Sequence, residues 1–139
     1  MRFATAARGI SFVMGVALLV GCGGSPAKGP ATVPVRGKVV FTKGGDVKTL
    51  FNKQARIEFE SVDQPGVRAV GPIAEDGSFV VATVTAEGGS AGAISGTHRV
   101  RLDLEDNQKL VAPQFLDFAK SGLKVTVPSA EPIEIKIWR

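Results

Sequence analysis

The sequence predicts an all-β protein built as a single seven-stranded antiparallel β-sandwich. Short runs of alternating apolar and polar residues recur along the chain, and this alternation is typical of half-buried strands. The 17 glycines and 8 prolines are scattered between the runs, where they favour turns. No long segment shows the periodicity of an amphipathic helix, and 139 residues is a one-domain length.

The first two strands are predicted on either side of a long loop. Residues 33–42 carry apolar side chains at alternate positions, and a glycine-containing turn then opens a loop over residues 43–54. Residues 55–62 alternate most cleanly, because Ile57 and Phe59 point one way and Arg56, Glu58 and Glu60 point the other. This second strand should therefore have one buried face and one wet face.

A hairpin is predicted between residues 67–73 and 78–84. Asp76-Gly77 separates these two β-prone runs, and glycine adopts positive φ at little cost. The stretch 86–96 contains four glycines and is predicted to be a loop.

Three further strands are predicted in the last third of the chain. In residues 97–104, His98 lies on the apolar face, while Arg99 and Arg101 lie on the polar face. We expect these two arginines to be solvated and paired with acidic neighbours. The sixth strand contains Leu123, Val125 and Val127, and the seventh contains Ile133, Ile135 and Ile137.

The N-terminus has the features of an export signal. Arg2 and Arg8 come before an apolar run that covers residues 10–20. That length fits the hydrophobic region of a signal peptide and is too short to span a bilayer. The run closes with Leu19-Val20-Gly21-Cys22, which contains the only cysteine of the protein.

This closing stretch resembles the bacterial lipobox, in which an aliphatic residue and two small or aliphatic residues precede a lipidated cysteine. The resemblance implies diacylglycerol on Cys22 and cleavage between Gly21 and Cys22. The alternatives are an ordinary secretory signal followed by an unmodified cysteine, or a short buried helix. Gly23 rather than an aspartate follows, which in the usual bacterial sorting pattern favours the outer membrane.

The chain is therefore predicted to contain three segments. A lipoprotein signal peptide covers residues 1–21, a flexible tether with lipidated Cys22 covers 22–32, and the β-sandwich domain covers 33–139. The tether lacks apolar periodicity and is rich in glycine, proline and small residues. Each buried CH₂ of an acyl chain contributes about 0.8 kcal/mol, so two or three chains make a stable anchor. The expected location is the cell membrane or outer membrane, with the domain facing the periplasm or the exterior.

Charge and cysteine content narrow the range of partners. The formal net charge of +4 falls to about +2 once Arg2 and Arg8 leave with the signal, because 15 basic residues then face 13 acidic ones. No basic stripe follows, so no nucleic-acid partner is expected. One cysteine excludes both an internal disulfide and a metal cage built from cysteines.

No catalytic constellation, metal site or cofactor site is predicted. His98, the only histidine, would need a nucleophile or carboxylate nearby for catalysis, or carboxylates as fellow metal ligands. We expect it to be a packing residue. Glu75-Asp76-Gly77 lacks the ligand spacing of a calcium loop. Residues 88–92 lack the Gly-Lys-Ser/Thr ending of a phosphate-binding loop.

Short motifs follow one another in order along nearly all of the domain, from about residue 33 to 138. They are Val35-Arg36-Gly37-Lys38-Val39, Ala55-Arg56-Ile57-Glu58-Phe59, Glu75-Asp76-Gly77-Ser78-Phe79, Gly96-Thr97-His98-Arg99-Val100, and Pro113-Gln114-Phe115 with Ser121-Gly122-Leu123. Their order resembles the carboxypeptidase-regulatory-like, or transthyretin-like, domain of many small bacterial lipoproteins. The resemblance implies a Greek-key sandwich of the transthyretin (prealbumin) type and an accessory role without catalysis.

The sequence departs from this family in two places. The family usually has an aromatic residue where this chain has His98, and often a tight turn where it has the segment 43–54. Enzymes of the wider fold, the hydroxyisourate hydrolases and the intradiol dioxygenases, use several histidines or a set of histidines and tyrosines. This chain has one histidine and no tyrosine, which disfavours both activities.

Two functional hypotheses follow. In the first, the protein is a lipid-anchored, non-catalytic envelope module that contacts the membrane through the lipid on Cys22 and binds an unknown envelope protein or glycan. In the alternative, it is a small-ligand or metal carrier or a weak hydrolase, using a pocket near His98 and the loop 86–96. A purely structural role in the envelope is a further possibility.

Overall fold

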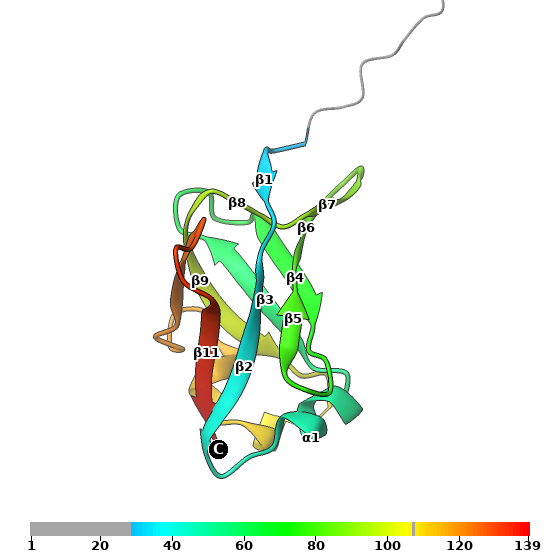
Figure 1. Ribbon diagram of the computed structural model, residues 1–139, viewed down its shortest axis with the longest axis vertical. Helices are drawn as coiled ribbons and strands as arrows, with labels where there is room; N and C mark the ends of the chain where they lie inside the picture. The colour runs from blue at the N-terminus through cyan, green and yellow to red at the C-terminus, as the bar shows by residue number, and fades with distance from the viewer. Residues whose placement is uncertain (1–28, 107) are drawn as a thin grey trace, which may run out of the picture.

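The computed structural model describes residues 29–106 and 108–139 and shows an all-β protein, as the sequence predicts (Figure 1). Its strands form a six-stranded, a three-stranded and a two-stranded sheet. The strands are β1 (Thr32–Val33), β2 (Arg36–Lys43), β3 (Arg56–Ser61), β4 (Arg68–Pro72), β5 (Ser78–Val80), β6 (Ala82–Thr85), β7 (Gly88–Ala91), β8 (Ala93–Ile94), β9 (Gly96–Asp103), β10 (Lys124–Val127) and β11 (Ile133–Trp138). The helical elements are α1 (Val47–Asn52), η1 (Gln108–Leu110) and η2 (Pro113–Leu116).

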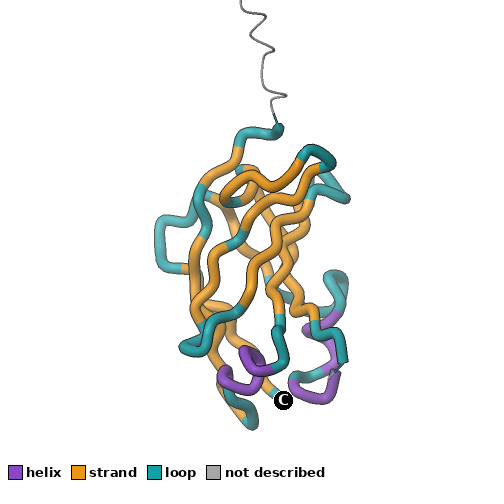
Figure 2. Tube along the Cα trace, turned by 90° about the vertical axis from the view of Figure 1, so that its right-hand side faces the viewer, coloured by secondary structure: helices purple, strands orange, loops and turns teal. Residues whose placement is uncertain are grey.

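Two sheets enclose the hydrophobic core. The larger has the order β10-β9-β3-β4-β6-β7 with antiparallel neighbours, and the smaller has the order β11-β2-β5 (Figure 2). Apolar side chains from both meet between them; the rings of Phe59 and Phe79, for example, lie 5.9 Å apart by their centroids. The largest fully buried side chains include Phe59, Phe115, Leu50, Ile57, Leu102, Ile137 and His98.

The chain enters the domain at one end, here called the tether end. There β1 pairs with β8, and the loops 61–67 and 128–132 lie at the same end, because Val62 bonds to Thr97 and Val127 pairs with Gly96. The C-terminus lies at the opposite end of the long axis (Figure 1). Over the described ranges, no helix is long and apolar enough to cross a membrane.

One pairing differs from the antiparallel arrangement that the sequence predicts. Strand β11 runs parallel to β2, with Ile135 opposite Val39. The cause is the short connection before it: β10 ends at the tether end, so β11 also begins there and runs in the same direction as β2. Alternation of side chains is the same in parallel and antiparallel strands, so the sequence pattern carries no sign of this direction.

The predicted ranges contain more strands than the seven expected. The range 78–84 divides at Val81, because β5 pairs with β2 in one sheet and β6 pairs with β4 in the other. The predicted loop 86–96 contains β7 and β8. The predicted hairpin turn is present, with Gly77 at φ 85°. The N–H of Gly77 donates to the carbonyl of Ala74 at 2.9 Å, and the N–H of Ala74 donates to the carbonyl of Ser78 at 2.8 Å.

The predicted loop 43–54 contains the short helix α1. Asp46 caps its N-terminus by accepting a hydrogen bond from the backbone N–H of Lys48 at 3.0 Å. The helix buries Leu50 completely and leaves Phe51 45% exposed. It therefore closes the end of the core that lies away from the tether (Figure 1).

Candidate functional site: a groove at the tether end

The two residues predicted to carry the lipid chemistry, Gly21 and Cys22, lie outside the described residues. Of the predicted tether 22–32, the structure describes residues 29–32. Thr32 already belongs to β1, where it pairs with Ile94.

His98 lies on the apolar side of β9, as the alternation predicts. Its side chain is 1% exposed, and its ring presents an edge to Phe59, with ring centroids 6.1 Å apart. Its Nδ1 lies 3.2 Å from the carbonyl oxygen of Gly96. Since a carbonyl only accepts, Nδ1 carries the proton in this contact. The imidazole is thus packed into the core and does not line the groove described below.

Burial lowers the pKa of His98, while the hydrogen bond to Gly96 and the charge of Asp63 oppose this effect. We expect the free energy of unfolding to fall as the pH drops below about 6.5, because the unfolded chain then binds a proton that the folded chain does not. The loss ends at the lower pKa of the folded state. Urea unfolding between about pH 7.5 and 5.5 measures this slope.

The His98→Phe variant is the control for this prediction. It keeps an aromatic ring at the position but has no group that titrates in this range. Its unfolding free energy should change less between these pH values than that of the wild type. An equal slope in both proteins would assign the pH dependence to other groups.

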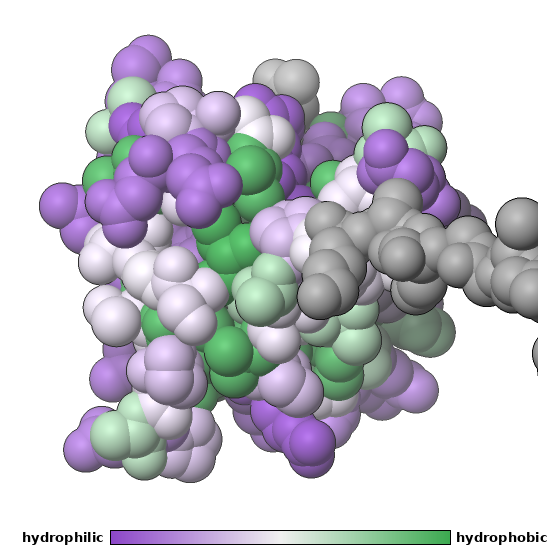
Figure 3. Space-filling model, turned by 90° about the horizontal axis from the view of Figure 1, so that it is seen from above, coloured by the Kyte–Doolittle hydropathy of each residue, from purple (hydrophilic) through white to green (hydrophobic). Residues whose placement is uncertain are grey.

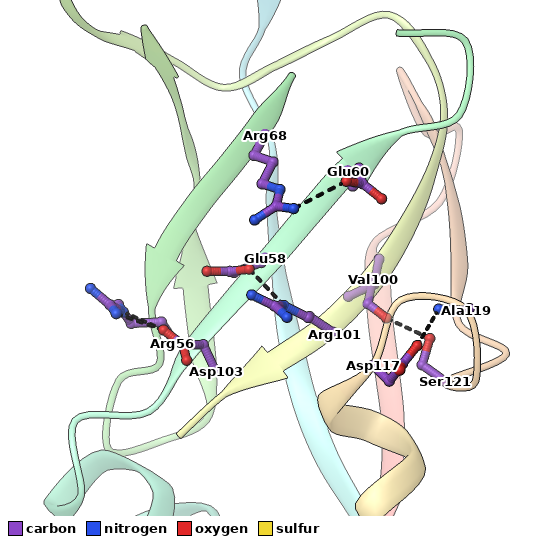
Figure 4. A network of polar contacts seen from close by, with 10 residues as sticks. All are labelled: Arg56, Glu58, Glu60, Arg68, Val100, Arg101, Asp103, Asp117, Ala119 and Ser121. Carbon is purple, nitrogen blue, oxygen red and sulfur yellow. Dashed lines mark hydrogen bonds and ion pairs between the residues drawn. The ribbon is translucent and has the colours of Figure 1, made fainter. Parts of the chain in front are cut away.

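A charged network covers the outer face of the six-stranded sheet (Figure 4). Arg101 donates from Nε to Glu58 at 2.7 Å, and Glu60 pairs with Arg68 at 3.3 Å and with Arg99 at 3.4 Å. This confirms the expectation that the arginines of β9 pair with acidic neighbours. The Nε of Arg99 is buried and has no hydrogen-bond partner within the described part of the chain.

The prediction of a wet face on β3 is wrong at Glu58, which is only 8% exposed. The ring of Phe118 lies over this face, 4.7 Å from the guanidinium carbon of Arg101 and 5.2 Å from that of Arg68. Such contacts between a guanidinium and an aromatic ring are attractive. No local sequence pattern signals this contact, because Phe118 is far from β3 along the chain.

Hydrogen bonds hold the segment around Phe118 against β9. Ser121 donates its hydroxyl to the carbonyl of Val100 at 2.6 Å, and Asp117 accepts from the N–H of Ala119 at 2.7 Å (Figure 4). At the far end of the network, Asp103 pairs with Arg56 at 2.6 Å, and this contact raises the pKa of Arg56. Each arginine of the network thus has a carboxylate partner, and the network is a structural feature of the sheet.

A groove of about 650 Å³ lies where the three-stranded sheet meets the tether end. Figure 3 looks onto this end and shows an apolar strip between polar surfaces. Val80 is 65% exposed on one wall. Gly37 allows close packing, since a Cβ there would collide with the carbonyl oxygen of Ile133 and the ring of Phe79. The lining comes from residues 34–37, 78–80 and 128–133.

The polar groups of the groove are few. Arg36 and Glu131 supply one charge of each sign. Ser78 donates both its N–H, at 2.9 Å, and its hydroxyl, at 2.6 Å, to Asp76, and these hydrogen bonds lower the pKa of Asp76. The hydroxyl is therefore engaged with a carboxylate, and no histidine lines the groove to act as its base. The arrangement suits binding through apolar contact.

Sequence reasoning did not find this groove, because its walls come from three separate segments. The prolines at 128 and 132 were the one local sign that the loop before β11 has a fixed shape. Across residues 29–106 and 108–139, no three histidine, cysteine, aspartate or glutamate side chains are grouped so as to hold a metal ion.

Comparison with known proteins adds no further assignment to this geometry. No family model matches the chain, and no curated protein matches it either.

Proposed function

We propose that the protein is a lipid-anchored lipoprotein of the cell envelope, with a non-catalytic β-sandwich module that binds a partner. The observation that carries the proposal is Leu19-Val20-Gly21-Cys22, which places the only cysteine directly after an apolar run of export-signal length. Lipid on Cys22 would hold the domain at the cell membrane or outer membrane, facing the periplasm or exterior. Metabolic labelling of the protein with a palmitate analogue tests this anchor.

We assign the domain to the transthyretin-like, Greek-key type of sandwich. Two facing sheets around one core are compatible with that type. Three of the motifs that suggested the resemblance lie on strands of the two sheets. Residues 35–39 enter β2, residues 55–59 enter β3, and residues 96–100 begin β9.

The groove at the tether end is the surface that we assign to the partner. Its walls are mainly apolar, with Val80 exposed and with Arg36 and Glu131 as its charged side chains. An apolar protein segment fits such a lining better than a glycan, whose many hydroxyl groups would lose hydrogen bonds to water. The partner proposed is therefore an envelope protein rather than a glycan.

A charge placed in the groove should weaken this interaction. We expect Val80→Glu to reduce partner binding by about tenfold or more, because binding would then remove a carboxylate from water in a mainly apolar groove. Photo-crosslinking from a residue beside the groove in native envelope, followed by mass spectrometry, gives the yield of each partner adduct. Competition by excess purified protein identifies the specific adducts.

Val84→Glu is the matched control. Val84 is 63% exposed, close to the 65% of Val80, but it does not line the groove. This variant should leave the yield of specific adducts unchanged. Equal losses in both variants, or no loss in either, would remove the groove as the binding surface.

The alternative function, a carrier or weak hydrolase acting near His98, has less support. The side chain of His98 is buried, and its Nδ1 already contacts the carbonyl of Gly96. Ligand binding at this residue would require the core to open around it.

A further inference from the structure

Strand β11 has one paired side and one open side. It forms an edge of the three-stranded sheet and pairs with β2 along its length (Figure 1). Within the described ranges, the backbone on its other side makes one hydrogen bond to another backbone group, at its last residue, where the carbonyl of Trp138 accepts from the N–H of Ala112 at 2.8 Å. The stretch 133–137 therefore presents unpaired strand edge.

The contacts show which backbone groups face this open edge. The carbonyl of Ile137 accepts from the hydroxyl of Thr42 on β2 at 3.1 Å, whereas that of Trp138 points the other way. Because backbone direction alternates along a strand, the N–H and C=O groups of Glu134 and Lys136 point away from β2. These four groups are the ones that a further strand would meet.

The sequence at this edge, Ile133-Glu134-Ile135-Lys136-Ile137, is complementary to itself in the antiparallel direction. If two copies pair around a two-fold axis through Ile135, Glu134 of each copy lies opposite Lys136 of the other. Those are also the residues whose backbone groups face outward, so each such pair exchanges two hydrogen bonds. Within one copy these two side chains pair with each other at 3.4 Å and are 52% and 66% exposed, so each can turn to the opposite charge of a second copy.

We propose that β11 is a dimerisation strand that pairs antiparallel with β11 of a second copy of this chain. The two three-stranded sheets would then join into one continuous sheet across an isologous interface. Opposite charges directly across an antiparallel pair stabilise it, and like charges destabilise it. The same charges exclude strands that lack this complementary order, which makes the edge selective. The pairing does not depend on the lipid anchor or on the groove.

Charge exchange at the two positions tests the proposal. Sedimentation velocity of the full chain in density-matched detergent should show a concentration-dependent dimer. Glu134→Lys and Lys136→Glu each place two like-charged pairs across the axis, and each should raise the dimer dissociation constant on the order of tenfold. The double variant, Glu134→Lys with Lys136→Glu, restores opposite charges and should return the constant close to that of the wild type.

Lys38→Glu is the control, because Lys38 lies on the same sheet but on the inner neighbour β2, opposite Glu134. It should leave the dimer intact. All altered side chains are exposed, so circular dichroism should show folded proteins throughout. A wild type that stays monomeric at every concentration would overturn the proposal, and so would single variants that dimerise as the wild type does.

Discussion

Replacement of Cys22 by alanine should move the protein from the membrane fraction to the soluble fraction of the envelope. The variant has no thiol to receive diacylglycerol, so it loses the acyl chains that hold the proposed lipoprotein to the bilayer. With about 0.8 kcal/mol for each buried CH₂, loss of two or three chains removes essentially all of the membrane affinity. Fractionation with detection by antibody measures the distribution, and labelling with a palmitate analogue should fall to background.

Ser25→Ala is a suitable control for the Cys22 variant. It changes a small polar residue in the same segment but leaves Leu19-Val20-Gly21-Cys22 intact. This control should stay in the membrane fraction and keep its label. If the Cys22→Ala protein remained bound to membranes, the anchor would have to lie elsewhere in the chain.

Replacement of Phe59 by alanine should give the largest loss of stability among single changes in the core. Phe59 is 0% exposed, and its ring packs against those of Phe79 and His98. Phenylalanine to alanine changes at such sites cost about 3–5 kcal/mol, through lost burial and the remaining cavity. That is a large part of the roughly 5–15 kcal/mol by which a domain is stable. Urea unfolding measures the difference.

Phe51→Ala removes the same ring from a position that is 45% exposed on α1. It should cost about 1 kcal/mol or less, because much of the ring already contacts water. The contrast between the two variants separates the effect of burial from that of the residue type. Similar losses for both would mean that Phe59 is not at the centre of the cooperative core.

The strands that the sequence predicts well are those with one core face and one polar face. Ile57 and Phe59 are both fully buried, and the polar residues between and beside them face the other side of the sheet. Alternation determines which way a side chain points, but not what covers it. Glu58 is buried because Phe118 and Arg101 come to it from distant parts of the sequence.

Other features depended on contacts that no local pattern contains. The helix α1 is short, and its only local signal was Asp46, a good N-cap that also fits a turn. The groove required residues 34–37 to meet the loop 128–132. The direction of β11 followed from the end of the domain at which β10 finishes. The proposed anchor, in contrast, rests entirely on a short contiguous motif.

The place where the chain enters the domain has a mechanical consequence. A pull on the N-terminal segment acts along β2, because the chain passes from β1 into β2 and then down the long axis (Figure 1). Strand β1, with two paired residues, would yield first. The bonds that join β2 to β11 and β5 run across the strand, so they share the load in shear instead of opening one after another. The domain should therefore resist unfolding by a force applied through its N-terminal strand.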